Sequence, residues 1–121
     1  MNFNDNKAIY LQIVDRICDE ILSGKYAKDE RIPSVREYAS IVEVNANTVM
    51  RSYDYLQSNE IIYNKRGIGY FVSPDAIDLI VRIRKEQFLN NEINYLFKQL
   101  KSVGIDSAEL CAMYEKYCNE Q

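Results

Sequence analysis

Three polar side chains stand close together in the middle of the chain: Asn45, Asn47 and Thr48. An asparagine carboxamide can pair with adenine through two hydrogen bonds, and a threonine can contact a phosphate or the methyl group of thymine. Arg51 follows Asn47 and Thr48 after one helical turn and can reach a phosphate. These residue types suit contact with base edges and with the phosphate backbone of nucleic acid.

The local sequence predicts that these side chains open a helix. Asn45 is a favourable N-cap residue, and the helix that follows is predicted over residues 46–58. Its apolar residues recur at the spacing of one buried face: Val49, Tyr53 and Leu56. Asn45 could be only a cap and Thr48 only a helix-start residue. Asn47 has no capping role, so base contact is favoured there.

A second short helix is predicted directly before this one. Ser34 and Glu37 have the spacing of a capping box. An apolar stripe follows: Val35, Tyr38, Ala39 and Val42. Only residues 43–45 separate the two helices, which is the arrangement of a helix-turn-helix. Arg36 in the first turn could anchor a phosphate. The alternative is a salt bridge to Glu37 or to another nearby acid.

A β-hairpin is predicted after the second helix. Two β-favouring runs at residues 61–63 and 69–72 flank a turn that has Lys65, Arg66 and Gly67 at its tip. A helix-turn-helix followed by a cationic hairpin is a winged helix. In that arrangement the second helix enters a major groove, and the wing reaches phosphates or the minor groove. An ordinary solvated turn is the alternative for the hairpin tip.

Five blocks of the sequence carry a resemblance to a known family. They cover residues 9–13, 21–26, 31–39, 44–49 and 66–72. Here the chain resembles the DNA-binding domain of GntR-family bacterial transcription regulators, and its short tail and Asn-x-Asn-Thr-Val sequence are most similar to the YtrA-like branch. The resemblance implies a homodimer, DNA contact by Arg36, and a short strand at residues 31–33 that pairs with the wing.

The predicted recognition helix departs from the family pattern at two positions. Many relatives carry arginine where Ala46 and Met50 stand, and neither of these side chains can donate a hydrogen bond to guanine. The departure favours recognition through asparagine and apolar contacts, and therefore A·T-rich sites.

The remaining chain is predicted to be helical around this domain. Residues 1–6 are expected to form a flexible arm, followed by an amphipathic helix that ends at Gly24. A long helix is expected from about Asp75 to Val103, and a last helix after Asp106. Their apolar surface exceeds what two helices can bury on each other. We therefore predict contact with a second copy through eight residues: Ile80, Phe88, Leu96, Phe97, Leu100, Leu110, Tyr114 and Tyr117. The alternative is a monomer whose tail folds back on its own winged helix.

The predicted fold class is α+β: a winged helix-turn-helix over residues 1–74, followed by a two-helix dimerisation appendage over residues 75–121. A symmetric dimer would place two recognition helices on two half-sites of a pseudo-palindrome. The predicted function is sequence-specific DNA binding as a homodimeric repressor, through the recognition helix 46–58 and the wing 64–69. The alternative is a winged helix used for protein–protein contact without DNA binding.

Composition constrains these readings. The net charge of the 121 residues is −3, and residues 31–70 hold only one more cation than anions, so DNA binding depends on where the charges lie. With no histidine, no phosphate-binding glycine-rich loop and no metal-ligand cluster, we expect no enzyme activity, cofactor or metal. No membrane span or targeting signal is visible, which predicts a cytoplasmic protein. An unknown small-molecule effector near Tyr95, Tyr114 and Tyr117 at the dimer interface is left open.

Overall fold

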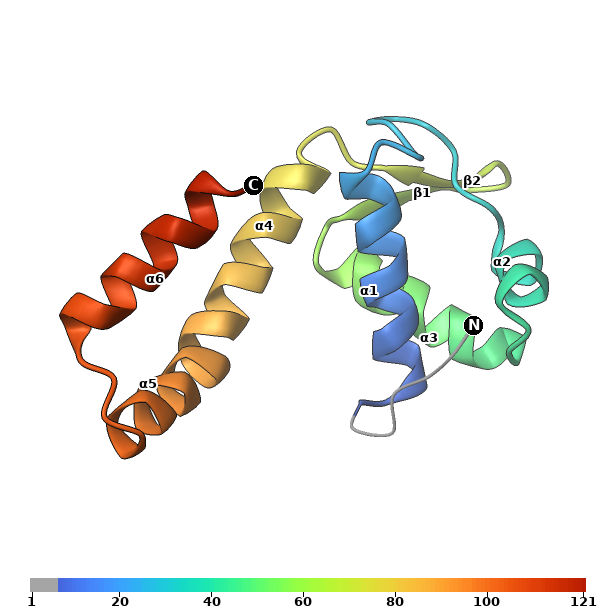
Figure 1. Ribbon diagram of the computed structural model, residues 1–121. Coiled ribbons are helices and arrows are strands. Elements are labelled where there is room, and N and C mark those ends of the chain that lie inside the picture. Colours follow the sequence, from blue (N-terminus) through green and yellow to red (C-terminus); the bar gives the residue numbers. More distant parts are fainter. Residues whose placement is uncertain (1–6) are drawn as a thin grey trace. The chain divides into compact units, whose positions relative to one another are not determined.

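Helix α1 (Ile9–Leu22) opens the part of the chain that the computed structural model describes, residues 7–121 (Figure 1). The predicted arm at residues 1–6 lies outside the described residues. One face of α1 is buried: Ile13, Val14, Ile17, Cys18 and Ile21. The backbone N–H of Lys25 donates to the carbonyl oxygen of Glu20 at 2.9 Å, and the φ of Gly24 is +87°. Gly24 therefore ends α1 as predicted, in a left-handed Schellman turn.

Helices α2 (Val35–Val42) and α3 (Ala46–Ser58) form the predicted helix-turn-helix. The Ser34 hydroxyl accepts from the backbone N–H of Glu37 at 3.1 Å, and the Glu37 carboxylate accepts from the backbone N–H of Ser34 at 3.0 Å. Glu43, in the left-handed conformation, turns the chain between the helices. Asn45 caps α3, which spans the predicted residues. Local capping signals therefore fix both helix starts.

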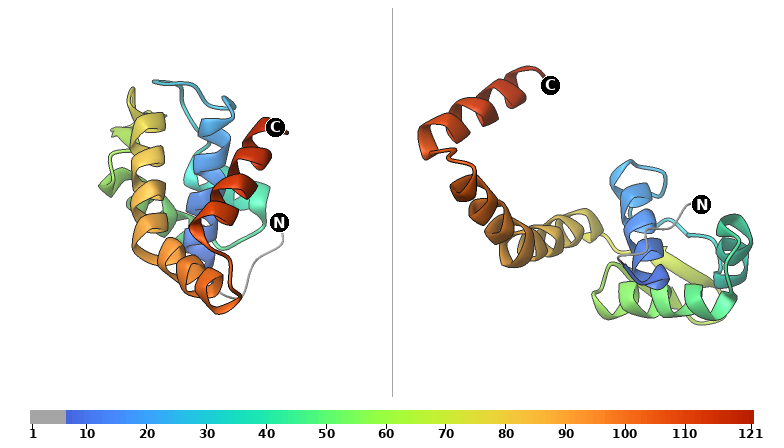
Figure 2. Two further views of the ribbon diagram at one scale, coloured as in Figure 1. Left: turned by 60° about the vertical axis from the view of Figure 1, so that its left-hand side comes forward. Right: turned by 60° about the horizontal axis from the view of Figure 1, so that its bottom comes forward.

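The core of the winged helix lies where α3 packs against α1 and α2. Figures 1 and 2 show α1 crossing α3. The predicted inward residues Val49, Tyr53 and Leu56 are fully buried. Burial of large aromatic and aliphatic side chains such as these is the main stabilising term of a small domain.

The wing is the antiparallel pair β1 (Ile62–Lys65) and β2 (Gly69–Val72), with Ile62 opposite Val72 and Lys65 opposite Gly69. A stretch before α2 pairs with the other edge of β2. There the backbone N–H of Ile32 donates to the carbonyl oxygen of Tyr70 at 2.9 Å, and that of Val72 donates to Glu30 at 3.0 Å. The pairing with the wing that the family resemblance implies is thus present, but as an isolated bridge between Arg31 and Phe71 and not as a strand over residues 31–33.

Helix α4 (Ala76–Gln87) buries Ala76, Leu79 and Ile80 in its first half. The chain divides into two compact units at this helix, one ending at Arg82 and the other running from Ile83 to Gln121. The sequence places the boundary earlier, between residues 74 and 75, where the new helix begins. Ile80, predicted to face a second copy, is only 1% exposed in the single chain. Its side chain therefore has no surface left for a partner.

The second unit is entirely helical. The long helix expected up to Val103 is present as α4, a π-helical turn η1 (Phe88–Glu92) and α5 (Ile93–Ser102); the π-helical turn was not predicted. Helix α6 (Ser107–Asn119) begins at Asp106, whose side chain accepts from the backbone N–H of Glu109 at 2.9 Å. Helices α5 and α6, both described in full, bury none of their residues. Among the described helices, none is long and apolar enough to cross a membrane.

Candidate nucleic-acid interface

The first turn of α3 brings together Asn45, Asn47 and Thr48. The side-chain oxygen of Asn45 accepts from the backbone N–H of Asn47 at 2.7 Å, so the cap uses the carbonyl end of this carboxamide. Its NH₂ group is the part that suits an acceptor on a base or phosphate. The side chain of Asn47 is exposed and that of Thr48 is half-buried. The capping bond therefore occupies the side-chain oxygen of Asn45, while Asn47 is exposed next to it.

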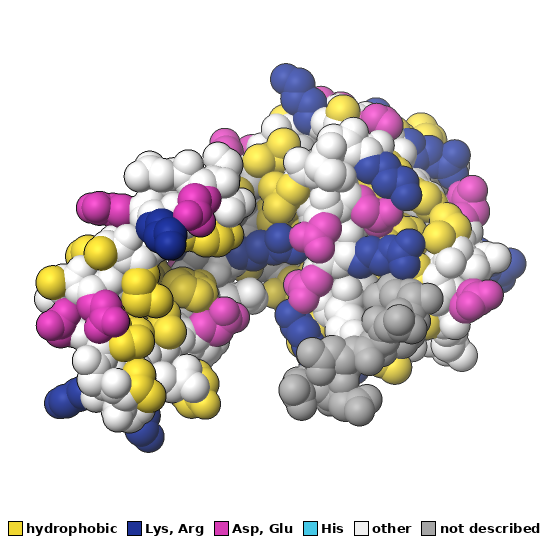
Figure 3. Space-filling model, in the orientation of Figure 1, with side chains coloured by type: hydrophobic (Ala, Val, Ile, Leu, Met, Phe, Trp, Pro, Cys, Tyr) yellow, Lys and Arg dark blue, Asp and Glu magenta, His cyan; other side chains and the backbone are white. Residues whose placement is uncertain are grey.

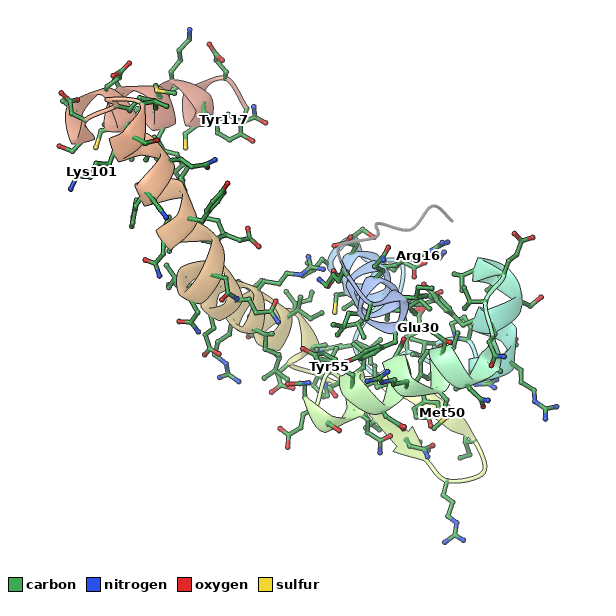
Figure 4. The ribbon with its side chains drawn as sticks, turned by 90° about the horizontal axis from the view of Figure 1, so that it is seen from below. Arg16, Glu30, Met50, Tyr55, Lys101 and Tyr117 are labelled. Carbon is green, nitrogen blue, oxygen red and sulfur yellow. The ribbon has the colours of Figure 1, made fainter. Side chains whose placement is uncertain are left out.

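Apolar side chains share the exposed surface of the same helix. Ala46 is exposed next to Asn47, and Met50, labelled in Figure 4, is 38% exposed one turn further along. Their surfaces offer methyl and thioether groups and no hydrogen-bond donor. The methyl and thioether groups at this end of α3 suit contact with the methyl groups of thymine, and the asparagine carboxamides suit hydrogen bonds with base edges.

The guanidinium of Arg51 lies over an aromatic ring of another helix. Its Cζ atom is 3.9 Å from the centroid of the Tyr10 ring on α1. Arg51 is exposed and Tyr10 is half-buried. The sequence predicts that Arg51 reaches a phosphate. It gives no sign of the contact between Arg51 and Tyr10, because the two residues are far apart in the chain.

Arg36 is exposed in the first turn of α2. Its neighbour Glu37 is engaged in the capping box, and hydrogen bonds with Ser34, first through its backbone N–H and then through its hydroxyl, lower the pKa of Glu37. Capping thus stabilises the carboxylate of Glu37 through Ser34. Among the described residues, the predicted alternative of a salt bridge between Arg36 and Glu37 is not formed.

The wing tip carries Arg66, Gly67 and Ile68 between the two strands. The φ of Gly67 is +78°, and the backbone N–H of Ile68 donates to the carbonyl oxygen of Lys65 at 2.8 Å, which closes the turn. Arg66 is exposed and Ile68 is 61% exposed. Lys65 ends β1, and its ammonium lies 4.6 Å from the centroid of the Phe71 ring. The tip therefore presents one arginine and one apolar side chain, with the lysine behind them.

Arg31 is a further cation at the wing. It is exposed, and it pairs with Phe71 in the sheet. Its side chain crosses Gly69 so closely that a Cβ atom there would lie 2.8 Å from the Arg31 Nε atom. The φ of Gly69 is +146°. A glycine in the wing opposite an arginine is the signal that could have identified this close approach of Arg31 to Gly69, but only once the pairing of the two segments was known.

The charge of the first unit is mixed. In Figure 3, Lys and Arg side chains lie between Asp and Glu side chains over this unit. With a net charge of −3 for the whole chain, a broad positive field does not supply the attraction. Contact with phosphate would come from individual cations on α2, α3 and the wing, and its strength would fall as salt concentration rises.

Comparisons with known proteins agree with this geometry. Residues 9–72, more than half of the chain, match the family described as bacterial regulatory proteins, gntR family. A crystal structure of a GntR-family protein from Bacteroides thetaiotaomicron is 59% identical with a TM-score of 0.84, covering 94% of this chain and 99% of that one. The transcriptional repressor YtrA of Bacillus subtilis is 32% identical over 82% of this chain and 70% of its own length.

A structure that contains DNA is also similar. The DNA-binding domain of AraR in complex with the operator ORX1 is 26% identical with a TM-score of 0.54, covering 60% of this chain and 89% of that one.

Proposed function

We propose that this chain, which belongs to the gntR family of bacterial regulatory proteins and is a DNA-binding transcription regulator, acts as a homodimeric repressor at a pseudo-palindromic operator. The family match and the operator complex of AraR support DNA binding over the alternative of a winged helix that only contacts proteins. Such a regulator works in the cytoplasm, where bacterial DNA lies.

The observation that carries the mode of DNA binding is the exposed first turn of α3. Asn47 and Thr48 stand at the end of the helix that enters a major groove in helix-turn-helix proteins. Arg36 and Arg51 contact the phosphates that flank this groove. Lys65, Arg66 and Gly67 of the wing contact the backbone or the adjacent minor groove. Base contacts then determine sequence preference, and the cations determine position and salt dependence.

The observation that carries the homodimer is the uncovered apolar surface of the second unit. Leu96 and Phe97 on α5 are 38% and 51% exposed, and Tyr114 and Tyr117 on α6 are 66% and 61% exposed. Phe88 is 41% exposed. Monomeric proteins rarely leave several large apolar residues of neighbouring helices in water, so a second copy is the covering partner that we propose. These five residues are all predicted to contact a second copy. Leu100 and Leu110 complete the predicted set once the buried Ile80 is left out.

Repression follows from the size of such a complex. A dimer that occupies two half-sites within a promoter excludes the polymerase from that DNA. YtrA, which matches most of this chain, carries the name of a transcriptional repressor.

We propose no effector site within a single protomer. The second unit has a shallow hollow of about 280 Å³ beside Phe97, Leu100 and Leu110. Ligand pockets usually hold roughly 300–1,000 Å³ and enclose most of the ligand. An effector near Tyr95, Tyr114 and Tyr117, which the sequence leaves open, would therefore need surface from both copies.

Selection from a random double-stranded DNA library at low salt tests the proposal. Wild-type protein is expected to enrich a two-fold-related motif, and the double variant Asn47→Ala, Arg66→Ala is expected to lose it. The control is Lys101→Ala, Asn119→Ala, which removes one cation and one carboxamide from exposed positions of the second unit. Absence of any enrichment by wild-type protein would contradict the proposal, because electrostatic affinity is greatest at low salt. A motif without two-fold symmetry would contradict the homodimer alone.

A further inference from the structure

The contact between Arg51 and Tyr10 joins α3 to the first turn of α1. The Cζ atom of Arg51 is 3.9 Å from the centroid of the Tyr10 ring, well within the distance of about 6 Å at which the negative face of an aromatic ring attracts a cation. Arg51 belongs to the exposed surface of the helix that carries Asn47. An arginine on this helix is therefore already held by a neighbour in the absence of DNA.

The ring that holds Arg51 is itself anchored to α3. Ser52, the residue after Arg51, is fully buried, and its hydroxyl donates to the backbone carbonyl oxygen of Tyr10 at 2.7 Å. The first turn of α1 is closed by hydrogen bonds from the N–H groups of Leu11 and Gln12 to Ala8, both at 3.1 Å. The backbones that carry the arginine and the tyrosine are thus fixed relative to each other next to the contact.

Stacking leaves the hydrogen-bonding groups of the arginine available. The five N–H donors of a guanidinium point outward in its plane, so a ring against its face leaves the donors at its edge able to bind phosphate oxygens. A long side chain that is already ordered also loses less conformational entropy when it binds. Holding Arg51 on Tyr10 therefore favours a phosphate contact.

We propose that Tyr10 is a positioning residue of the DNA interface, whose ring orients the Arg51 guanidinium for one phosphate of the bound duplex. The inference rests on the proposed function, because it deepens the role of Arg51 in the same interface. It assigns a part in DNA binding to α1, a helix to which the sequence gives no chemical role. The probe can be any duplex, because a phosphate contact carries no sequence information.

The test is a double-mutant cycle on binding to a mixed-sequence 30-base-pair duplex at several salt concentrations. Tyr10→Phe keeps the ring and is expected to bind as wild type. Tyr10→Leu is expected to weaken binding about two- to fivefold, the range of an exposed cation–π contact. Arg51→Ala is expected to weaken binding further and to reduce the salt slope by about one. In the Arg51→Ala background, Tyr10→Leu is expected to have no additional effect.

Several results would overturn the inference. Equal losses for Tyr10→Phe and Tyr10→Leu would mean that the hydroxyl contacts the DNA directly. A loss from Tyr10→Leu that persists in the Arg51→Ala background would mean that the ring acts only on the fold. If Tyr10→Leu does not fold by circular dichroism, Arg51→Lys serves instead, since it keeps the charge without the planar face; wild-type affinity for Arg51→Lys would then overturn the inference. Failure of wild-type protein to bind any duplex at low salt would contradict the proposed function itself.

Discussion

The hydroxyl of Tyr53 on α3 donates a hydrogen bond to the backbone carbonyl oxygen of Pro33 at 2.6 Å. Pro33 lies directly before the N-cap of α2, and the Tyr53 ring also meets the edge of the Tyr70 ring of β2, with centroids 5.0 Å apart. One buried side chain of the recognition helix thus contacts the start of the other helix and the wing. It therefore joins α3 to both the segment before α2 and the wing.

Replacing Tyr53 with phenylalanine should therefore destabilise the domain while preserving its packing. The change leaves the Pro33 carbonyl without this donor, and loss of such a part-buried hydrogen bond costs about 1 kcal/mol. Urea denaturation followed by circular dichroism measures the effect. Tyr55→Phe, which removes a hydroxyl from a half-buried tyrosine of the same helix, is the control. Equal free energies of unfolding for the two variants would show that the hydrogen bond contributes nothing.

Gly69→Ala should destabilise the wing. The φ of +146° belongs almost only to glycine and costs about 1–3 kcal/mol for other residues, and the new Cβ atom would also clash with Arg31. Adding Arg31→Ala is expected to recover the part of the loss that comes from the clash. Gly67→Asn is the control, because its φ of +78° suits asparagine and the space around it is open. Denaturant unfolding measures the stability of wild type, the two Gly69→Ala variants and Gly67→Asn. If Gly69→Ala is as stable as wild type, the backbone at residue 69 is not strained by a side chain.

Alkaline pH should weaken the fold through two buried tyrosines. Burial, and then the hydrogen bond to Glu20 at 2.5 Å, raise the pKa of Tyr38, while burial raises the pKa of Tyr53. Because the folded-state pKa values exceed the unfolded value of about 10, this stability is complete below pH 10 and is lost as pH rises towards the folded values. Urea unfolding from pH 8 to pH 11 tests this. Tyr38→Phe is expected to flatten the dependence, and the exposed-site control Tyr95→Phe to leave it as in wild type.

Phe97→Asp should dissociate the proposed homodimer. Phe97 is 51% exposed on α5, and placing a carboxylate within an apolar contact requires its desolvation without a partner. Sedimentation equilibrium is expected to show at least about a tenfold weaker self-association, as for a central interface residue. Lys98→Gln, which lowers the net charge by the same amount at the neighbouring exposed position, is the control. Unchanged dimerisation of Phe97→Asp would place the interface elsewhere.

Three helix starts could be predicted because each rests on a capping signal within a few residues. Ser34 with Glu37, Asn45 and Asp106 cap α2, α3 and α6 as their types and spacing indicate. Helical periodicity likewise identified Val49, Tyr53 and Leu56 as the buried face of α3.

The contacts that the sequence did not reveal are tertiary. Arg51 on Tyr10 and Arg31 on Gly69 join segments about forty positions apart, and they form only because α1 crosses α3 and residues before α2 pair with the wing. The helical spacing also placed Ile80 on an apolar face, but it did not indicate that residues of the same chain bury this side chain. The π-helical turn Phe88–Glu92 has no capping residue or glycine that announces it.

The pairing of Ile32 with Tyr70 and of Glu30 with Val72 makes β2 the middle of three extended stretches. Both helices of the helix-turn-helix lie in the segment between these paired ends. Completing the sheet therefore closes a loop of roughly forty residues, whose entropic cost must be met before the pairing is gained. The wing is expected to form late in folding, after α2 and α3 have brought its two outer parts together. A nascent chain that ends before residue 72 would contain both helices but would lack the complete strand β2, with which the segment before α2 pairs.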